Sequence, residues 1–254
     1  MKNSTENLVF STPELEKYFS KNRICWDQFY VSERAVIEQV NPSSSSKVLD
    51  IGCGCGGLGV ALNERFGVRS YTGVEINSEA AETAIKLNPS ARILTGDFLT
   101  MDRDLMDAES YDLVFSLSCI DWNLTFEKML VKAWSMVKPG GVFIASYRLT
   151  VDIGVNDINK SYQYINYEGV MEGEIAPYVV INAKELIAKL LDFKPSKLLG
   201  RGYYGPPSKT AITPFKNLCF SVIAAQKAID SEEQEYDLEL PQDILTSIKS
   251  RQSK

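Results

Sequence analysis

Apolar residues recur along this chain in two patterns, short continuous runs and runs with a spacing of three or four residues. Short runs bounded by turn residues are typical of buried strands, whereas the wider spacing predicts a helix with one apolar face. One helix-like stripe consists of Phe126, Met129, Leu130, Ala133, Trp134 and Val137. We therefore predict a helix over residues 126–137 that packs by this stripe and is ended by Pro139, Gly140 and Gly141.

Predicted strands and helices alternate between residues 46 and 146. The strands of this region are predicted at 47–51, 71–76, 91–97, 111–118 and 141–146. The helices are predicted at 58–66, 78–88 and 126–137. Strands that alternate with helices at this spacing form a parallel sheet with helices on both faces. The pattern therefore predicts an α/β fold.

The flanking segments have other patterns. Residues 1–45 predict N-terminal helices, one of which opens with Thr12 as its N-cap and Pro13 in its first turn. Residues 148–181 are polar and rich in tyrosine, and they show little periodicity. We interpret them as a small cap insertion after the fifth strand, placed to cover an acceptor site.

The C-terminal third returns to a regular pattern. After a predicted helix at 182–193, strands are predicted at 197–205 and 218–226. Because no helix separates these two strands, they predict an antiparallel pair at the sheet edge. Residues 229–254 predict an acidic C-terminal tail. A chain of 254 residues fits one large α/β domain, which we expect over residues 1–228.

Composition and charge narrow the class of protein. The net charge of −6 and the absence of any basic run argue against a nucleic-acid partner. No apolar run approaches the roughly 20 residues of a membrane-spanning helix, so no membrane partner is expected. The first residues lack the pattern of a secretory signal, and the five cysteines are scattered. These features favour free thiols and a cytoplasmic location.

The sequence VLDIGCGCGGLG, residues 48–59, is the strongest motif. It places Gly52, Gly54 and Gly57 in G-x-G-x-x-G spacing between a strand and a helix, and Glu75 ends the next strand. Such a loop and acid bind the phosphate and ribose of NAD, but they suit S-adenosylmethionine equally. A metal site at Cys53 and Cys55 is not expected, because the chain has no histidine and no second thiol pair at ligand spacing.

Asp50, two residues before the first glycine, distinguishes the two cofactors. A dinucleotide places its pyrophosphate at the helix N-terminus, where a nearby carboxylate would repel it. S-adenosylmethionine instead brings a sulfonium and an ammonium group, which a carboxylate attracts. The third strand ends in Asp97 and Phe98, which could bind and cover an adenine ring, and VKPGG follows the 126–137 helix pattern.

With these motifs in this order, the chain resembles the class I S-adenosylmethionine-dependent methyltransferases. The resemblance covers residues 46–146 through VLDIGCGCG, GVEI, GDFL and VKPGG, and residues 182–226 through topology. It implies a Rossmann-like fold with a mainly parallel seven-stranded sheet, an antiparallel edge strand and helices on both faces. It also implies a set of donor-binding residues: Asp50, Gly52, Cys53, Gly54, Glu75, Ile76, Asp97, Phe98, Ser116 and Leu117.

The acceptor side is less defined. The stretch SLSCIDWN lacks the histidine often found there in the family, so we consider Asp121 as a general base or a contact to a substrate amine. A role as helix N-cap is an equal alternative for Asp121. Expected substrate contacts are Trp122, Tyr147, Tyr162, Tyr164, Tyr167 and Tyr203. The alternative for the tyrosines is packing within the cap.

The sequence thus predicts a methyltransferase that uses S-adenosylmethionine and acts on a small molecule, with a sugar or other hydroxylated metabolite preferred. No metal is expected to take part. Two alternatives stay open at this point, an NAD-dependent oxidoreductase and a non-catalytic S-adenosylmethionine-binding protein. Asp50 and the lack of histidine argue against the oxidoreductase.

Overall fold

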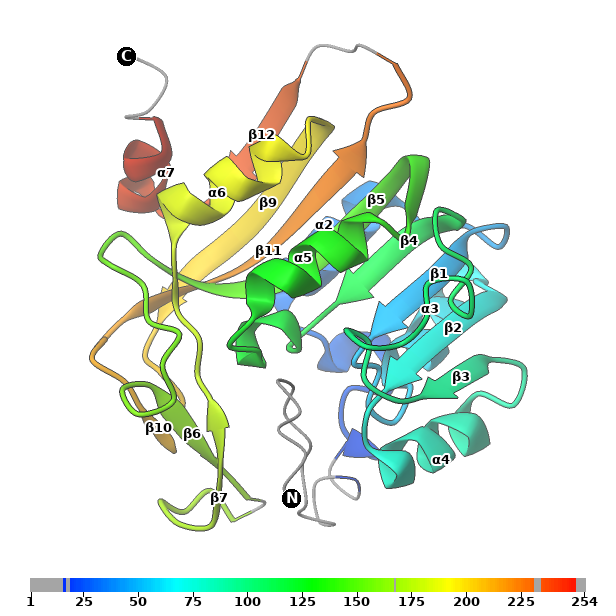
Figure 1. The fold of residues 1–254 in the computed structure, drawn as a ribbon, viewed down its shortest axis with the longest axis horizontal. Helices are drawn as coiled ribbons and strands as arrows, with labels where there is room; N and C mark the ends of the chain where they lie inside the picture. The colour runs from blue at the N-terminus through cyan, green and yellow to red at the C-terminus, as the bar shows by residue number, and fades with distance from the viewer. Residues whose placement is uncertain (1–15, 17–18, 167, 231–233, 250–254) are drawn as a thin grey trace.

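The structure is a computed structural model, and it describes residues 16, 19–166, 168–230 and 234–249. Thr12, Pro13 and Tyr167 lie outside the described residues. Helices surround one large twisted sheet, and a small separate sheet lies beside one end of it (Figure 1). The predicted α/β class is confirmed by this arrangement.

The large sheet has nine strands among the described residues, in the order β12-β9-β11-β5-β4-β1-β2-β3, and β8 also pairs with β5. Its strands are β1 (Lys47–Ile51), β2 (Ser70–Glu75), β3 (Arg92–Thr95), β4 (Tyr111–Ser116), β5 (Val137–Thr150), β8 (Ile181–Asn182), β9 (Pro195–Gly205), β11 (Leu218–Lys227) and β12 (Glu235–Glu239). Strands β1 to β5 pair in parallel, as predicted. Their carboxyl ends therefore meet at one edge of the sheet, where ligands bind in open α/β folds.

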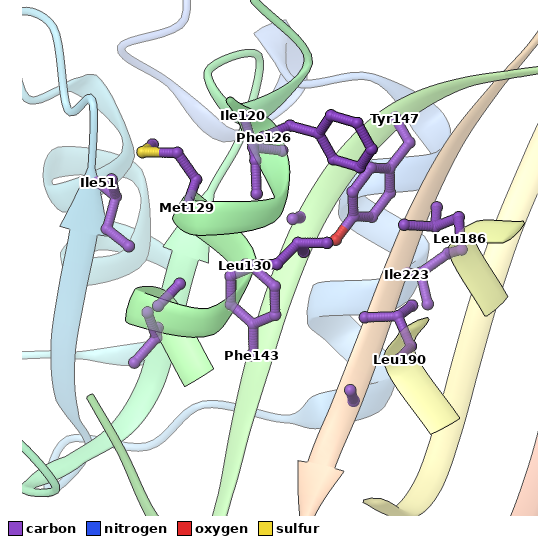
Figure 2. Packing of buried hydrophobic residues seen from close by; sticks show 14 of the residues in the cluster. Ile51, Ile120, Phe126, Met129, Leu130, Phe143, Tyr147, Leu186, Leu190 and Ile223 are labelled. Carbon is purple, nitrogen blue, oxygen red and sulfur yellow. The ribbon is translucent and has the colours of Figure 1, made fainter. Parts of the chain in front are cut away.

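Helices cover both faces of the large sheet. The α-helices are α2 (Val31–Val40), α3 (Gly57–Phe66), α4 (Ser78–Leu87), α5 (Phe126–Trp134), α6 (Ala183–Asp192) and α7 (Gln242–Lys249), and the 3₁₀ helices are η1 (Trp26–Gln28) and η2 (Ile120–Trp122). Side chains alternate along each strand, so β1 sends Val48 to the α2 and α3 cluster but Leu49 and Ile51 to the α5 and α6 cluster. Four residues of the apolar stripe, Phe126, Met129, Leu130 and Ala133, are buried in this second cluster, and Trp134 packs against it partly buried (Figure 2).

The position of the antiparallel strand corrects one prediction. β11 runs antiparallel to both β5 and β9 and lies between them, so it is not an edge strand. The 126–137 helix prediction was also too long. The helix ends at Trp134, and Val137 to Gly141 belong to β5. Gly140 adopts a φ of 77°, and a Cβ on Gly141 would lie 2.8 Å from the carbonyl oxygen of Tyr111, so these glycines permit the close, irregular pairing of β5 with the start of β4.

The acidic segment 229–254 is not simply a tail. It contributes β12, which pairs in parallel with β9 at the sheet edge, and α7, whose Ile244 is fully buried. Two of its leucines pack over glycines of β9: a Cβ on Gly200 would lie 2.8 Å from Leu238, and one on Gly202 would lie 2.8 Å from Leu240. The acidic side chains mask an alternating apolar pattern, so composition alone misjudged this segment.

The predicted cap insertion contains short strands. β6 (Tyr162–Ile165) and β7 (Glu174–Pro177) form an antiparallel pair, and β10 (Ala211–Ile212) joins β6 from the loop between β9 and β11. The resulting three-stranded sheet stands apart from the large sheet (Figure 1). The cap is therefore built from two segments that lie about 50 residues apart in the sequence.

Candidate functional site

A cavity opens where the first four parallel strands end. The donor residues implied by the sequence resemblance, all but Ser116, line it: Asp50, Gly52, Cys53, Gly54, Glu75, Ile76, Asp97, Phe98 and Leu117. Trp122, an expected substrate contact, lines it as well. Ser116 is fully buried and is not part of the lining. Residues from four separate strand ends thus share one cavity, because parallel strands place their ends together.

The glycine loop depends on backbone shapes that other residues adopt with strain. Gly52, Gly54 and Gly56 have φ values of 72°, 54° and 77°. The amide of Gly52 donates to the carbonyl oxygen of Val74 at 2.9 Å, which ties the loop to the end of β2. Gly56, which the motif spacing did not single out, is the N-cap of α3. The glycine-rich run GCGCGG, residues 52–57, is the sequence feature that could have indicated this cap.

Glu75 organises the loop from the next strand. Its Oε2 accepts from the amide of Gly54 at 2.8 Å, and its Oε1 accepts from the amide of Asn77 at 2.9 Å. Burial raises the pKa of this carboxyl, and the same backbone hydrogen bonds oppose the shift. Each carboxylate oxygen has further lone pairs, so Glu75 can accept from ligand hydroxyls while it holds the loop.

Asp50 is a buried carboxyl on the cavity wall. The hydroxyl of Tyr71 donates to its Oδ2 at 2.6 Å. Burial raises the pKa of Asp50 from 3.8 to about 7, while the hydrogen bond from Tyr71 and the charge of Arg23 act in the opposite direction. A cationic ligand beside Asp50 would favour its ionised form.

The turn after β3 forms one wall of the cavity, and Lys132 of α5 holds it in place. Phe98 is 4% exposed and lines the cavity. The ammonium of Lys132 lies 5.3 Å from the Phe98 ring centre and donates to the carbonyl oxygen of Leu99 at 3.0 Å. Asp97 accepts from the amide of Leu99 at 2.8 Å, which fixes the turn. This anchoring fixes the turn as one wall of the cavity.

Three thiols lie around the glycine loop, those of Cys53, Cys55 and Cys119. Burial raises the pKa of Cys55 and of Cys119 to about 12, and carboxylates nearby add to the shift. The thiols are therefore protonated at neutral pH and fill space beside the loop. Within the described ranges, no group of three or more Cys, Asp and Glu side chains is placed to hold a metal ion.

The segment before α2 forms part of the cavity and was missed by sequence reasoning. Glu16, Phe19, Asn22, Arg23 and Phe29 line the cavity from this segment. No motif marks these residues, and they reach the cavity only because the segment folds back over the glycine loop. A Cβ on Gly57 would lie 2.0 Å from the carbonyl oxygen of Arg23, so the third glycine of the motif permits this close approach.

Asp121 occupies a buried ion pair and does not line the cavity. Its Oδ2 lies 3.1 Å from Nη2 of Arg148, and both side chains are less than 10% exposed. Burial raises the pKa of Asp121, and the charge of Arg148 opposes this shift. The N-cap of α5 is Thr125, so Asp121 is not the cap considered as an alternative. The ion pair gives Asp121 a structural task that the sequence pattern did not reveal.

Arg148 connects Asp121 to the cap. Its Nη1 donates to the carbonyl oxygens of Asp121 at 2.9 Å and Val179 at 3.2 Å. Its guanidinium carbon lies 4.4 Å from the Trp122 ring centre and 3.8 Å from that of Tyr178. Arg148 thus fixes Trp122, a cavity residue, against the segment that returns from the cap.

The predicted tyrosine contacts are dispersed. Tyr147 is 2% exposed and packs in the core with Phe126 and Leu130, so its expected substrate contact is wrong (Figure 2). Side chains alternate along β5, and Tyr147 faces α5 and α6. Tyr162 and Tyr164 pack edge to face in the cap sheet with ring centres 5.6 Å apart, and Tyr203 is 43% exposed on β9. None of these side chains lines the described cavity.

Comparison with known proteins agrees with the geometry of the site. Residues 48–141 match the family described as methyltransferase domain. The sterol 24-C-methyltransferase of Debaryomyces hansenii is 29% identical over 151 residues, which are 57% of this chain and 38% of that protein. The 18S rRNA (guanine(1575)-N(7))-methyltransferase of Saccharomyces cerevisiae is 26% identical over 64% of this chain and 62% of that protein. The chain therefore spans less than two thirds of the length of either relative.

Phosphoethanolamine N-methyltransferase 2 of Haemonchus contortus, solved with S-adenosyl-L-methionine, has the same fold. It superposes with a TM-score of 0.55 and 15% identity over 76% of this chain and 51% of that chain. Within the part of this chain that the structure describes, no helix is long and apolar enough to cross a membrane. Residues 48–141 are therefore similar to a methyltransferase domain, and the surrounding fold is the one seen in that S-adenosyl-L-methionine complex.

Proposed function

We propose that this protein transfers the methyl group of S-adenosylmethionine to a small-molecule acceptor. The observation that carries the proposal is the convergence of Asp50, the glycine loop, Glu75 and the Asp97–Phe98 turn on one cavity. In this assignment Glu75 accepts from the ribose hydroxyls, and Phe98 covers the adenine. A buried carboxyl beside the loop suits a cationic methionine group and opposes a pyrophosphate, which disfavours NAD.

The donor is already activated, so the protein acts mainly by alignment. The methyl group leaves a sulfonium centre in a direct displacement, and the enzyme must hold a nucleophile behind it at near-attack distance. Leu117 and Trp122 line the cavity beyond the glycine loop and are assigned to this transfer region. A carboxylate or a neutral amine needs no general base there, whereas an alcohol does.

A small acceptor is supported by the surface chemistry of the chain. The net charge of −6 disfavours an RNA acceptor such as the one named for the yeast relative. Trp122, Phe19 and Phe29 give the cavity apolar walls suited to a compact organic molecule. A hydroxylated metabolite is our preferred class, and we propose that transfer requires no metal. The free cysteines favour a cytoplasmic site of action.

The donor assignment predicts selective binding of S-adenosylhomocysteine over NAD. Calorimetry on the purified protein should show binding of S-adenosylhomocysteine and no binding of NAD at the same concentrations. Glu75→Gln should weaken S-adenosylhomocysteine by about 1–3 kcal/mol, because the amide cannot accept at both oxygens. Glu82→Gln, an exposed change on α4, is the matched control and should bind as the parent does. Binding of NAD with no response to S-adenosylhomocysteine would refute the proposed function.

The raised pKa of Asp50 predicts a pH-dependent affinity for S-adenosylmethionine. If the donor binds the ionised carboxyl, a pKa of about 7 in the free protein means that binding releases a proton below neutrality. Affinity should then rise about eightfold from pH 6 to pH 7.5 and level off above it. Asp50→Asn should remove this dependence, and a flat profile in the parent would contradict it.

The stability of the ligand-free protein should fall as the pH rises, whereas the affinity for the donor should increase. The pKa of Asp50 rises from 3.8 to about 7 in the folded state, so folding favours the protonated form. This contribution to stability is complete below about pH 4 and is lost as the pH rises through about 7. Thermal melts of the parent and Asp50→Asn over this range separate the contribution of Asp50 from that of other groups.

A further inference from the structure

The described lining of the cavity contains more acidic than basic side chains. Its lining carboxyl side chains are Glu16, Asp50, Glu75, Glu79 and Asp97. Arg23 is the one cationic side chain among the described lining residues. A guanidinium among these carboxyl groups is a specific feature, because it is the one described lining side chain whose charge attracts an anionic group.

The Arg23 backbone is held in an unusual conformation. Its φ is 62°, a left-handed value that costs a non-glycine residue energy unless the surroundings enforce it. The carbonyl group of Arg23 is seated against Gly57, whose missing side chain leaves the space. The same residue is therefore fixed to the start of α3, directly beside the glycine loop.

The Arg23 side chain is held in one orientation but does not use all its hydrogen-bond donors. Among the described residues, Nη2 is the one guanidinium nitrogen with a hydrogen bond, to Oε1 of Glu33 at 2.8 Å. The guanidinium carbon lies 4.7 Å from the ring centre of Phe29 and 5.3 Å from that of Tyr30. A guanidinium carries five N–H donors, so Arg23 retains donors for a ligand while Glu33 and two rings fix its plane.

We propose that Arg23 binds a carboxylate of the ligand that occupies this cavity. Its planar fork matches a carboxylate, and its charge lies near Asp50, where the methionine end of the donor is assigned. The carboxylate comes either from the methionine part of the donor or from the acceptor, and both sources use the same chemistry. The inference rests on the proposed function, since it assumes that S-adenosylmethionine occupies the cavity.

Three probes separate the sources of the carboxylate. S-adenosylhomocysteine carries the amino-acid carboxylate, and 5′-methylthioadenosine has the adenosine and thioether without it. Calorimetry with Arg23→Met should show S-adenosylhomocysteine weakened about ten- to a hundredfold and 5′-methylthioadenosine within twofold of the parent, if the donor supplies the carboxylate. Arg23→Lys should recover part of the loss, because it keeps the charge without the fork. Succinate added to the S-adenosylhomocysteine complex tests the acceptor as the source.

A different result is expected if the acceptor supplies the carboxylate. Both nucleoside probes should bind Arg23→Met as they bind the parent, and succinate should raise the melting temperature of the parent complex but not of the variant complex. The proposal is overturned if Arg23→Met weakens both nucleoside probes by the same factor. It is also overturned if neither the nucleoside probes nor succinate distinguish the variant from the parent.

Two further variants protect the test from trivial causes. Arg23→Met leaves Glu33 buried without its cation, so the double variant Arg23→Met/Glu33→Gln removes that charge and keeps an oxygen for the amide of Tyr30. Arg34→Met removes a different arginine of the same region, paired with the exposed Asp27, and should change no probe. If S-adenosylhomocysteine fails to bind the parent itself, the proposed function fails and not the role of Arg23 alone.

Discussion

Replacing Gly52 by alanine is expected to weaken S-adenosylhomocysteine by about thirtyfold or more. At a φ of 72°, an alanine costs about 1–3 kcal/mol. A Cβ there would lie 2.4 Å from Sγ and 2.9 Å from Cβ of Cys119. Such overpacking costs about 1–3 kcal/mol more. The loop must shift to relieve the contact, and the loop is a wall of the cavity. Calorimetry measures the loss of affinity directly.

A matched glycine isolates the contact from the backbone strain. Gly67 has a φ of 71° at the end of α3, but a Cβ there would meet Ser44 at an ordinary 3.7 Å. Gly67→Ala should cost stability through strain and leave affinity unchanged. Adding Cys119→Gly to Gly52→Ala should recover part of the binding, because it removes both contacting atoms. If Gly52→Ala binds as tightly as the parent, the loop geometry is not required for donor binding.

The second large effect is expected at the buried ion pair of Asp121 and Arg148. Arg148→Met should lower the free energy of unfolding by about 3–5 kcal/mol, because it leaves a buried carboxylate without its cation. The loss also removes the donor to the carbonyl oxygens of Asp121 and Val179. Urea unfolding followed by circular dichroism measures the change. The fluorescence of Trp122 should change as well, because Arg148 packs on its ring.

A surface pair provides the control for this prediction. Lys189→Met breaks the ion pair with Glu127, in which both side chains are more than a third exposed, and should change stability by about 0–1 kcal/mol. The companion variant Asp121→Asn tests the role of Asp121 as a general base. A large loss of stability is expected from its ion pair. Normal stability with reduced methyl transfer would instead assign Asp121 to catalysis.

The part of the site that we assign to the donor could be predicted from the sequence because it depends on local signals. Asp50, Glu75 and Asp97 each stand at or just after the end of a strand that the apolar pattern identified. Parallel pairing then brings strand ends to the same edge, whatever the details of packing. The glycine loop could be recognised for the same reason, since its φ values are a local requirement of the turn from β1 into α3.

The other parts of the site could not be predicted in the same way. The partner of Asp121 is 27 residues away on β5, and no spacing rule connects a 3₁₀ turn to that strand. Arg23 enters the cavity because a segment without any motif folds over Gly57. Whether Tyr147 faces the site or the core depends on the register of β5, and a shift of one residue would reverse it.

The sequence by itself determined the elements of the central sheet, the glycine turn that we assign to the donor and the carboxyl groups around it. These follow from periodicity and from backbone limits, which act over a few residues. The tertiary structure alone decided that Arg23 lines the cavity, that Asp121 is paired, and that the acidic C-terminal segment adds β12 beside β9. Those outcomes depend on contacts between distant segments, where burial and charge pairing select one arrangement among many that the local pattern permits.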